Sequence, residues 1–329
     1  MCMMEVIKVF VVTYNRVEYL KQSLNSIINQ SYKNIEITVL DNCSTDGTEL
    51  YVKSIDDKRI HYIKHDHNIG GRDNIAFAFS HCCNSKYFAI FHDDDVLHPN
   101  LIEEELKYLE THNKCVAVSC LRNIIDDNGQ IVKIAKVRNG IERSYSRCGF
   151  FDEYLNHQRS FTFPATLYRT DFILDNAINV RNEPGPCADV VVYMDIEKAG
   201  GTVAEIPKPL IDYRVYKQQD SSSHLEEMLI QLISFLSQDD YYSELLSEDV
   251  IGRKKYLRWY YNRLIIRMVS ECISYGDAKR YFEDMKNALD NPEKHIKIYF
   301  IMLRIVCFFH VPANMMYKVY KRIRQHNRK

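Results

Sequence analysis

The 329-residue sequence lacks the features that mark several large classes of protein. Its 43 basic and 44 acidic residues give a net charge of −1, so no overall field attracts nucleic acid. No apolar run reaches the roughly 18 residues of a membrane-spanning helix, because the nearest candidate, residues 296–311, contains Lys297 and Arg304. None of the ten cysteines forms a CxxC pair with metal-binding spacing, which favours reduced thiols in a cytosolic compartment. The first residues run straight into an apolar stretch, so we expect no signal peptide.

The first 110 residues alternate between strand-like and helix-like runs, which is typical of a parallel sheet covered by helices. Asn15 is predicted to begin a helix, with Glu18 completing a capping box. The turn at residues 126–129 is of the hairpin type, so we expect a mixed sheet beyond it. Residues 207–209 (PKP) are predicted to be a loop. The predicted strands lie at residues 6–12, 35–40, 60–64, 87–91, 115–120, 161–168 and 202–206.

Three adjacent aspartates, Asp93, Asp94 and Asp95, follow the predicted strand at residues 87–91. Adjacent carboxylates repel one another, so a stable fold places them in open water or around a cation. Open α/β sheets form their ligand crevice at the carboxyl ends of the strands, which favours the cation. Hard oxygen ligands select Mg²⁺ or Mn²⁺. The cluster therefore predicts metal-assisted chemistry on a phosphate or diphosphate, and the alternative is a solvated loop that caps a helix.

Polar residues follow three other predicted strands, in segments 13–16, 41–42 and 70–72. Right-handed crossovers bring the ends of parallel strands to one edge of a sheet, so we expect these segments to meet the aspartates there. A nucleotide fits that arrangement. Asp41 can accept a base N–H, Tyr14 can stack on the ring, and the aspartates can hold a metal on the diphosphate.

In this order and spacing, the motifs resemble those of the inverting family 2 glycosyltransferases, which have the GT-A fold. The resemblance covers roughly residues 5–224. It implies an α/β fold whose Rossmann-like, mixed but mostly parallel sheet is flanked by helices. Residues 1–224 would form the catalytic domain, with a nucleotide-binding half (1–110) and an acceptor-binding half (111–224), followed by a helical appendage at 225–329. The matching segments are residues 11–16 (VVTYNR), 40–48 (LDNCSTDGT), 68–70 (NIG), 93–95 (DDD) with Pro99, and 211–214 (IDYR) with Gln219 and Ser221.

The resemblance also implies roles for single residues in binding the donor. Thr13 and Asp41 would contact the uridine of a UDP-sugar, with Arg72 as a helper. Asp93 and Asp95 would be the two acidic positions of the family's DxD motif and would hold Mn²⁺ or Mg²⁺. Asp94, the middle member of the cluster, would face the donor between them.

Asp189, in a helix predicted at residues 188–199, occupies the place of the family's catalytic base. Its task would be to remove a proton from the acceptor hydroxyl while that oxygen attacks the anomeric carbon with inversion. Two positions depart from the family pattern. Ala188 stands where a glutamate is frequent, and Tyr216 stands where a histidine is frequent, so we predict no third protein ligand at Tyr216. His92 and His98, which flank the aspartates, are interpreted as structural.

Simpler interpretations remain open at single positions. Asp41 is also a common turn residue, Asp189 a common helix N-cap, Tyr14 a side chain that can pack, and Arg72 an ordinary surface cation. For the whole chain, the alternatives are a sugar-phosphate nucleotidyltransferase and a non-catalytic protein that binds sugar nucleotides. The nucleotidyltransferase would need a glycine-rich loop after its first strand, and residues 13–16 contain no glycine.

Family analogy suggests the biological setting. The predicted acceptor is a glycan or a polyprenyl-diphosphate-linked saccharide, in the biosynthesis of a surface polysaccharide such as capsule or O-antigen. Basic clusters with aromatic neighbours at residues 253–261 and 318–329 predict peripheral contact with the inner face of the cell membrane. The alternative is that these helices pack on the catalytic domain or against a second copy in a homodimer. We expect a cytoplasmic protein with no nucleic-acid partner.

Overall fold

The computed structural model describes residues 5–137, 143–157, 159–216, 225–248, 250–269, 274–288 and 301. The contacts divide the chain into two compact units. The larger unit, which contains the sheet, consists of Met1–Phe151, Arg159–Asn182 and Ala188–Ser223. The helical unit consists of Asp152–Gln158, Glu183–Cys187 and His224–Lys329. The division of residues 1–224 into two functional halves stays a prediction.

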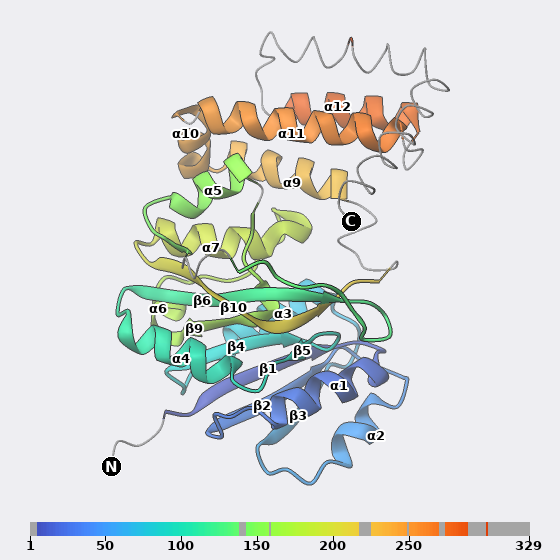
Figure 1. Cartoon of the computed structure of the whole chain (residues 1–329), viewed down its shortest axis with the longest axis vertical. Coiled ribbons are helices and arrows are strands. Elements are labelled where there is room, and N and C mark those ends of the chain that lie inside the picture. Colours follow the sequence, from blue (N-terminus) through green and yellow to red (C-terminus); the bar gives the residue numbers. More distant parts are fainter. Residues whose placement is uncertain are drawn as a thin grey trace. The chain divides into compact units, whose positions relative to one another are not determined.

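One mixed, mostly parallel sheet organises the larger unit (Figure 1), and the predicted fold class is confirmed. Its strand order is β3-β2-β1-β4-β9-β6-β10-β5, while β7 pairs with β6 and β8 with β10. The strands β1 to β4 are parallel, as are β6 and β10, and β9 lies antiparallel between these two parts. The strands are β1 (Ile7–Thr13), β2 (Ile35–Asp41), β3 (Ile60–Lys64), β4 (Tyr87–His92), β5 (Val96–Leu97), β6 (Cys115–Ile125), β7 (Ile131–Lys133), β8 (Arg143–Tyr145), β9 (Thr166–Arg169) and β10 (Thr202–Arg214).

The helices between the strands are amphipathic, and α1 shows why its sequence becomes a helix. Leu20, Leu24 and Ile27 recur at helical spacing and are fully buried, while the opposite face is polar. The helices and 3-10 turns up to β10 are α1 (Val17–Ile28), α2 (Thr48–Lys53), α3 (Gly71–Ser80), α4 (Leu101–Thr111), α5 (Gly149–His157), η1 (Phe163–Ala165), α6 (Thr170–Asp175), η2 (Gly185–Cys187) and α7 (Ala188–Lys198).

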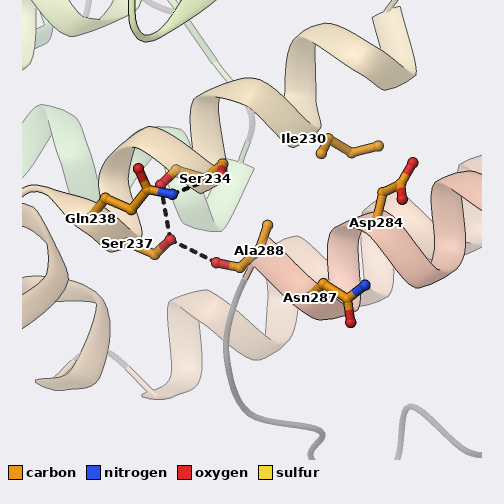
Figure 2. Close-up of a pocket in the computed structure, with 7 residues that line it drawn as sticks. All are labelled: Ile230, Ser234, Ser237, Gln238, Asp284, Asn287 and Ala288. Carbon is orange, nitrogen blue, oxygen red and sulfur yellow. Dashed lines mark hydrogen bonds between the residues drawn. The ribbon is translucent and has the colours of Figure 1, made fainter.

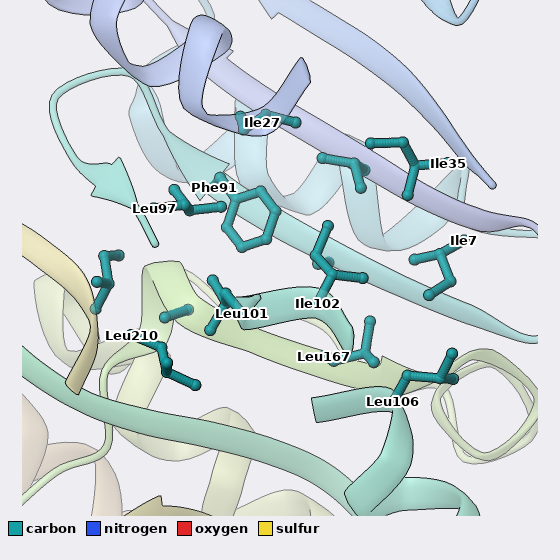
Figure 3. Packing of buried hydrophobic residues seen from close by; sticks show 14 of the residues in the cluster. Ile7, Ile27, Ile35, Phe91, Leu97, Leu101, Ile102, Leu106, Leu167 and Leu210 are labelled. Carbon is teal, nitrogen blue, oxygen red and sulfur yellow. The ribbon is translucent and has the colours of Figure 1, made fainter. Parts of the chain in front are cut away.

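The two faces of the sheet have different cores. Ile7, Val9 and Val11 of β1 belong to an aliphatic core shared with α1 and α4 (Figure 3). Aromatic side chains line the other face, where the ring of Phe79 in α3 meets the edge of Phe88 in β4 at a centroid distance of 5.4 Å. Both faces are covered, as is usual for parallel strands, and the functional residues are therefore found at the strand ends.

The capping box predicted at the start of α1 is wrong. The helix begins at Val17, and Asn15 instead has a left-handed backbone with φ of 50°. The Asn15 Oδ1 accepts a hydrogen bond from the Thr45 N–H at 2.8 Å, and Asp46 Oδ2 accepts one from the Val17 N–H at 2.8 Å. Glu18 pairs with a lysine of its own helix. A loop 29 residues away in the sequence therefore caps this helix, which local pattern could not reveal.

The loop predicted at residues 207–209 is also wrong, because β10 continues through it to Arg214. The pairing of β10 with β6 shifts register between Ile206 and Pro209 and again between Pro209 and Ile211. Proline lacks the N–H that a regular ladder needs, and bulges of this kind tolerate it. The longer strand carries Asp212, Tyr213 and Arg214 to the edge where β4 ends.

The helical unit buries the apolar face that we predicted to contact a membrane. It is built from α9 (Leu225–Gln238), α10 (Asp240–Glu248), α11 (Val250–Val269) and α12 (Tyr275–Ala288). Of the predicted cluster at 253–261, the cations Lys254, Lys255 and Arg258 are exposed. Four of its large apolar residues are buried within the unit, and Trp259 is half-buried, so little apolar surface is left for contact with lipid. These buried residues are Tyr256, Leu257, Tyr260 and Tyr261. The second predicted cluster, residues 318–329, lies outside the described residues.

A cavity of about 480 Å³ lies between α9 and α12 (Figure 2). The Ser237 hydroxyl donates a hydrogen bond to the Ala288 carbonyl at 2.6 Å within it. No residue predicted for catalysis or donor binding lines this cavity. Its lining residues are Ile230, Ser234, Ser237, Gln238, Asp284, Asn287 and Ala288. Within the described ranges, every helix is too short or too polar to span a bilayer.

Candidate active site at the carboxyl ends of the parallel strands

The parallel register brings the predicted donor-binding residues to one edge of the sheet. Thr13, the last residue of β1, lies beside Asp41, the last residue of β2. On the other side, Val12 lies beside His92, the last residue of β4. The loops that leave these three strands therefore begin side by side, and the aspartates follow directly.

Asp93 faces the turn after β1. Its Oδ2 accepts hydrogen bonds from the Thr13 hydroxyl at 2.7 Å and from the Tyr14 N–H at 3.4 Å. Its Oδ1 pairs with Arg16 Nη1 at 3.3 Å. Burial, and next the charge of Asp94, raise the pKa of Asp93 to about 7. Both oxygens thus have protein partners, and Asp93 ties the turn after β1 to the acidic cluster.

Asp94 is buried between Arg16 and Tyr216. Its Oδ2 pairs with Arg16 Nη1 at 3.3 Å and accepts a hydrogen bond from the Tyr216 hydroxyl at 3.2 Å. The Arg16 guanidinium lies over the Tyr216 ring, 5.4 Å from its centroid. Burial raises the pKa of the Tyr216 phenol, and the neighbouring Asp94 adds to that effect. Tyr216, at the position of the family's frequent histidine, therefore contacts the cluster as a neutral hydrogen-bond donor.

Asp95 is fully buried and only half satisfied. Its Oδ1 accepts a hydrogen bond from the backbone N–H of Arg214 at 2.9 Å, whereas Oδ2 has no hydrogen-bond partner among the described residues. The same is true of the buried Nε2 of His92. Burial, and next the charge of Asp94, hold the pKa of Asp95 well above its usual range. Burying a polar atom without a hydrogen-bond partner destabilises the folded state, and binding a cation would remove that penalty. Both atoms are therefore candidate metal ligands.

These atoms form a set that can hold a metal ion. A ring nitrogen of His92 and carboxylate oxygens of Asp94 and Asp95 lie within 4.8 Å of one another. Burial lowers the pKa of His92, so its imidazole is neutral and keeps a lone pair for a metal. Sequence reasoning set His92 aside as structural, yet the structure brings it to the carboxylates. His98, by contrast, shares a hydrogen bond with Asp212 at 3.1 Å outside this group.

Arg214, the last residue of the IDYR segment that the sequence analysis matched to the family, holds the loops around the cluster. This side chain is fully buried. Its Nε donates to the Asp94 carbonyl at 2.7 Å, and its Nη1 donates to the carbonyls of Asp126 and Asp127 at 3.0 and 3.1 Å. Its Nη2 donates to Gln22 Oε1 at 2.8 Å.

Asp41, the last residue of β2, is fully buried. Its Oδ1 accepts a hydrogen bond from the Ser44 N–H at 2.8 Å, and its Oδ2 accepts one from the Tyr62 hydroxyl. Burial, and next the bond to Asp41, raise the pKa of Tyr62. Tyr14 lies at the end of β1 with 43 % of its surface exposed, which leaves its ring accessible to a base. Arg72 is on the surface at the start of α3, where it pairs with Asp73 at 3.1 Å.

Asp189 lies in the first turn of α7 and is partly buried. Burial raises its pKa to about 6. Burial, and next the charge of Asp95, raise the pKa of Tyr213 to about 12, and the charge of Asp189 adds a smaller contribution. The guanidinium carbon of Arg122 lies 5.3 Å from the centroid of the Tyr213 ring.

The chain resembles known glycosyltransferases in sequence. The model of Glycosyl transferase family 2 matches residues 8–171. An uncharacterized glycosyltransferase of Haemophilus influenzae is 29 % identical over 234 residues, which span 67 % of this chain and 69 % of the relative. This chain is also 31 % identical to WfaP of Escherichia coli over 110 residues, which span 33 % of this chain and 43 % of WfaP. WfaP is named a UDP-Glc:alpha-D-GlcNAc-diphosphoundecaprenol beta-1,3-glucosyltransferase.

Solved structures share the fold at low sequence identity. Residues 1–349 of S. aureus TarS, in complex with UDP-GlcNAc, align with a TM-score of 0.66 and 15 % identity over 98 % of this chain and 92 % of that one. The mannosyltransferase PcManGT from Pyrobaculum calidifontis, in complex with GDP-Man and Mn²⁺, aligns with a TM-score of 0.55 and 15 % identity over 96 % and 87 %. The chain belongs to glycosyl transferase family 2 and is a glycosyltransferase with the GT-A fold. This assignment removes the nucleotidyltransferase and the non-catalytic alternatives.

Proposed function

We propose that this enzyme moves one sugar from a UDP-sugar to a glycan or lipid-linked saccharide, with inversion at the anomeric carbon and with the help of a divalent cation. The observation that carries the proposal is the group formed by His92, Asp94 and Asp95, whose ligand atoms lie within 4.8 Å of one another. This group follows β4 at the edge where the parallel strands β1, β2 and β4 end.

The uridine side of the site would be built from the ends of β1 and β2. Tyr14 offers an exposed ring for stacking, and Thr13 and Asp41 lie next to each other in the register. Asp41 would recognise the base after Tyr62 releases one carboxylate oxygen, and Arg72 would turn from Asp73 toward the diphosphate. The complex of TarS with UDP-GlcNAc and the name of WfaP, which uses UDP-Glc, support uridine as the nucleoside.

The cation would be held by His92, Asp94 and Asp95. Their donor set fits, because two of the three residues carry a buried atom that lacks a partner among the described residues. Asp93, also predicted as a ligand, would reach an ion only after releasing Arg16. An imidazole nitrogen favours Mn²⁺ over Mg²⁺, and PcManGT was solved with Mn²⁺. A cation bound there would stabilise the negative charge that grows on the departing diphosphate.

Asp189 would be the general base. A pKa of about 6 leaves its carboxylate ionised at neutral pH, yet basic enough to accept the proton of an attacking hydroxyl. Arg214 would be a positioning residue, since its side chain binds the backbone carbonyls of Asp94, Asp126 and Asp127 around the cluster. The name of WfaP supports a diphosphate-linked lipid acceptor, which would place the reaction at the cytoplasmic side of the membrane.

A donor screen tests this function directly. The purified protein is heated with UDP-, GDP- and dTDP-sugars, each with Mn²⁺ or with EDTA, and its melting temperature is recorded. We expect a UDP-sugar to raise the melting temperature when Mn²⁺ is present and to do so much less in EDTA, because a ligand that binds the folded state stabilises it. The positive donor is then tested for release of UDP with a saccharide acceptor. If no donor changes the melting temperature and no nucleoside diphosphate is released, the proposal is wrong.

A further inference from the structure

Residues 131–137 form an exposed aliphatic segment that the donor site does not use. Four large aliphatic side chains lie here within seven positions, and no other stretch of the described residues exposes so many. Their exposed fractions are 56 % for Ile131, 61 % for Val132, 66 % for Ile134 and 49 % for Val137. Soluble surfaces rarely concentrate aliphatic side chains in this way unless they meet an apolar partner.

Among the described residues, the strand at the start of this segment has exposed side chains on both of its faces. The strand β7 (Ile131–Lys133) pairs with β6, through Ile124 with Lys133 and Ile125 with Ile131, and lies off the main order of the sheet. Successive side chains of a strand point to opposite faces, so Ile131 and Val132 project in opposite directions. A folded protein partner would cover one face and leave the other wet. The boundary of a lipid bilayer surrounds an inserted strand and would cover both.

The charges of the segment suit an anionic surface. Lys133 and Lys136 are exposed between the aliphatic side chains, and residues 131–137 contain no acidic residue. The nearest acids lie in the preceding turn. There Asp126 Oδ1 accepts hydrogen bonds from the N–H groups of Asn128 and Gln130, whereas Asp127 is exposed. Interleaved aliphatic and lysine side chains are the composition that binds the interface of anionic bilayers.

The hairpin is firmly connected to the acidic cluster. Arg214 Nη1 donates to the Asp126 and Asp127 carbonyls at the turn, and the Arg214 N–H binds Asp95. Two residues after β7, the Ala135 N–H donates to Asn123 Oδ1 at 3.1 Å. A contact made by the hairpin would therefore set the height of the catalytic edge above the surface that the hairpin touches.

We propose that residues 131–137 bind an anionic lipid bilayer, with the aliphatic side chains at the boundary of the acyl chains and the two lysines among the headgroups. This assigns the membrane contact to the catalytic unit and not to the aromatic face of α11, which is buried. The inference does not depend on the sugar, on the donor or on the identity of the acceptor.

The test uses the full chain and vesicles of phosphatidylcholine with or without phosphatidylglycerol. We expect the parent to sediment with the anionic vesicles, and the variant Ile131→Ser/Val132→Ser/Ile134→Ser to partition at least tenfold more weakly. Lys133→Glu/Lys136→Glu should lose the preference for phosphatidylglycerol. The matched control, Leu50→Ser/Ile63→Ser/Leu174→Ser, alters exposed aliphatic residues of the same unit and should bind like the parent. Parent-like binding by the first variant overturns the proposal, as does loss of binding only when the basic residues of 318–329 are reversed.

A second measurement locates the inserted side chain directly. In Val132→Trp, brominated lipids should quench the new fluorescence, whereas in Leu50→Trp they should not; the native Trp259 gives both proteins the same background. Quenching that is equal in the two variants overturns the proposal. So does an emission of the introduced tryptophan in Val132→Trp that is already blue-shifted without vesicles, because another part of the chain or a second copy then covers the segment. Donor hydrolysis by all variants shows separately whether the proposed function holds.

Discussion

Two buried acidic side chains, one in each unit of this protein, differ in how completely they are hydrogen-bonded. In the helical unit, the nearly inaccessible Glu226 binds Arg267 through both carboxylate oxygens, at 2.9 and 2.7 Å, and Arg263 at 3.3 Å. In the sheet unit, the fully buried Asp95 has one oxygen without a partner among the described residues. A buried carboxylate whose lone pairs are all used is part of the scaffold. One that is left incomplete is available for a proton, a cation or a substrate.

A third buried acid sharpens this comparison. Glu105 of α4 is fully buried, and neither of its carboxylate oxygens has a hydrogen-bond partner in the described part of the chain. Burial holds its pKa well above the usual range. It is not a member of the candidate metal-binding group, so a buried carboxylate without hydrogen-bond partners does not by itself define a site. The candidate active site differs because several buried side chains with unpartnered atoms lie together at the end of a strand.

The largest effect is expected for Asp189→Asn. If Asp189 is the base, turnover falls by about 10² to 10⁴-fold, because the amide cannot accept the proton of the acceptor. The affinity for UDP should not change. Asp171→Asn is the matched control, because Asp171 is likewise the second residue of its helix but is exposed. Turnover is measured as UDP release with saturating donor, and affinity by calorimetry. Activity within threefold of the parent would exclude Asp189 as the base.

The pH dependence of turnover provides an independent check on the same residue. A base works only when it is deprotonated, so the rate should rise with pH through the pKa of about 6 and then level off. Activity that is undiminished at pH 5 contradicts the assignment.

The next largest effect is expected for the scaffold acid. Glu226→Ala leaves two arginines near a vacated, buried position, so it should destabilise the helical unit by about 3–5 kcal/mol. Its neighbour Glu227 pairs with a more exposed arginine, and Glu227→Ala should cost about 1 kcal/mol or less. Urea unfolding followed by the fluorescence of Trp259, the only tryptophan, reports on this unit. Equal losses for the two variants would show that burial of the ion pair is unimportant here.

Substitutions of the proposed metal ligands should have smaller effects, and these effects should differ between Mn²⁺ and Mg²⁺. Asp95→Asn should weaken Mn²⁺ binding by about tenfold to a hundredfold, and His92→Gln should weaken it by about tenfold while hardly affecting Mg²⁺. The matched control is His98→Gln, because His98 lies in the same segment but bonds to Asp212. Calorimetry with each metal and UDP measures the affinities. Pulsed electron paramagnetic resonance should detect a nitrogen bound to Mn²⁺ in the parent and none in His92→Gln. A nitrogen signal that survives this change contradicts His92 as a ligand.

The smallest effect is expected for Glu105→Met, which should increase the stability of the folded protein and not decrease it. The folded pKa of Glu105 is raised, so between about pH 4.5 and that value the folded state binds more protons than the unfolded state. The parent therefore loses stability as the pH rises through this window. Methionine removes that loss and should stabilise the protein by about 1–3 kcal/mol at pH 8 while changing little at pH 4.5. Urea unfolding followed by circular dichroism measures it, and the exposed Glu110→Met is the control. A variant less stable than the parent at pH 8 would show that Glu105 has a partner that matters.

Much of the site could be predicted because its parts follow strands. The apolar runs before Thr13, Asp41 and Asp93 predicted β1, β2 and β4, and parallel pairing requires their ends to meet at one edge. The contacts that cross from one motif to another could not be predicted. Asp46 caps α1 from 29 residues away, and Arg214 reaches Gln22 across the unit. Such contacts depend on how loops pack in three dimensions and have no period in the sequence.

By itself, the sequence determined the alternation of strands and helices, the family and the edge of the sheet that carries the acidic residues, because all three depend on local periodicity and on motif order. The tertiary structure alone decided which atoms of that edge are already bonded and which remain free. In it, Asp93 contacts Thr13 and Arg16, whereas His92 and Asp95 each keep an atom without a hydrogen-bond partner among the described residues. It also exposes the aliphatic side chains of residues 131–137. The physical reason is that burial and hydrogen bonding are set by neighbours that lie far away along the chain, and these neighbours exist only once the chain has folded.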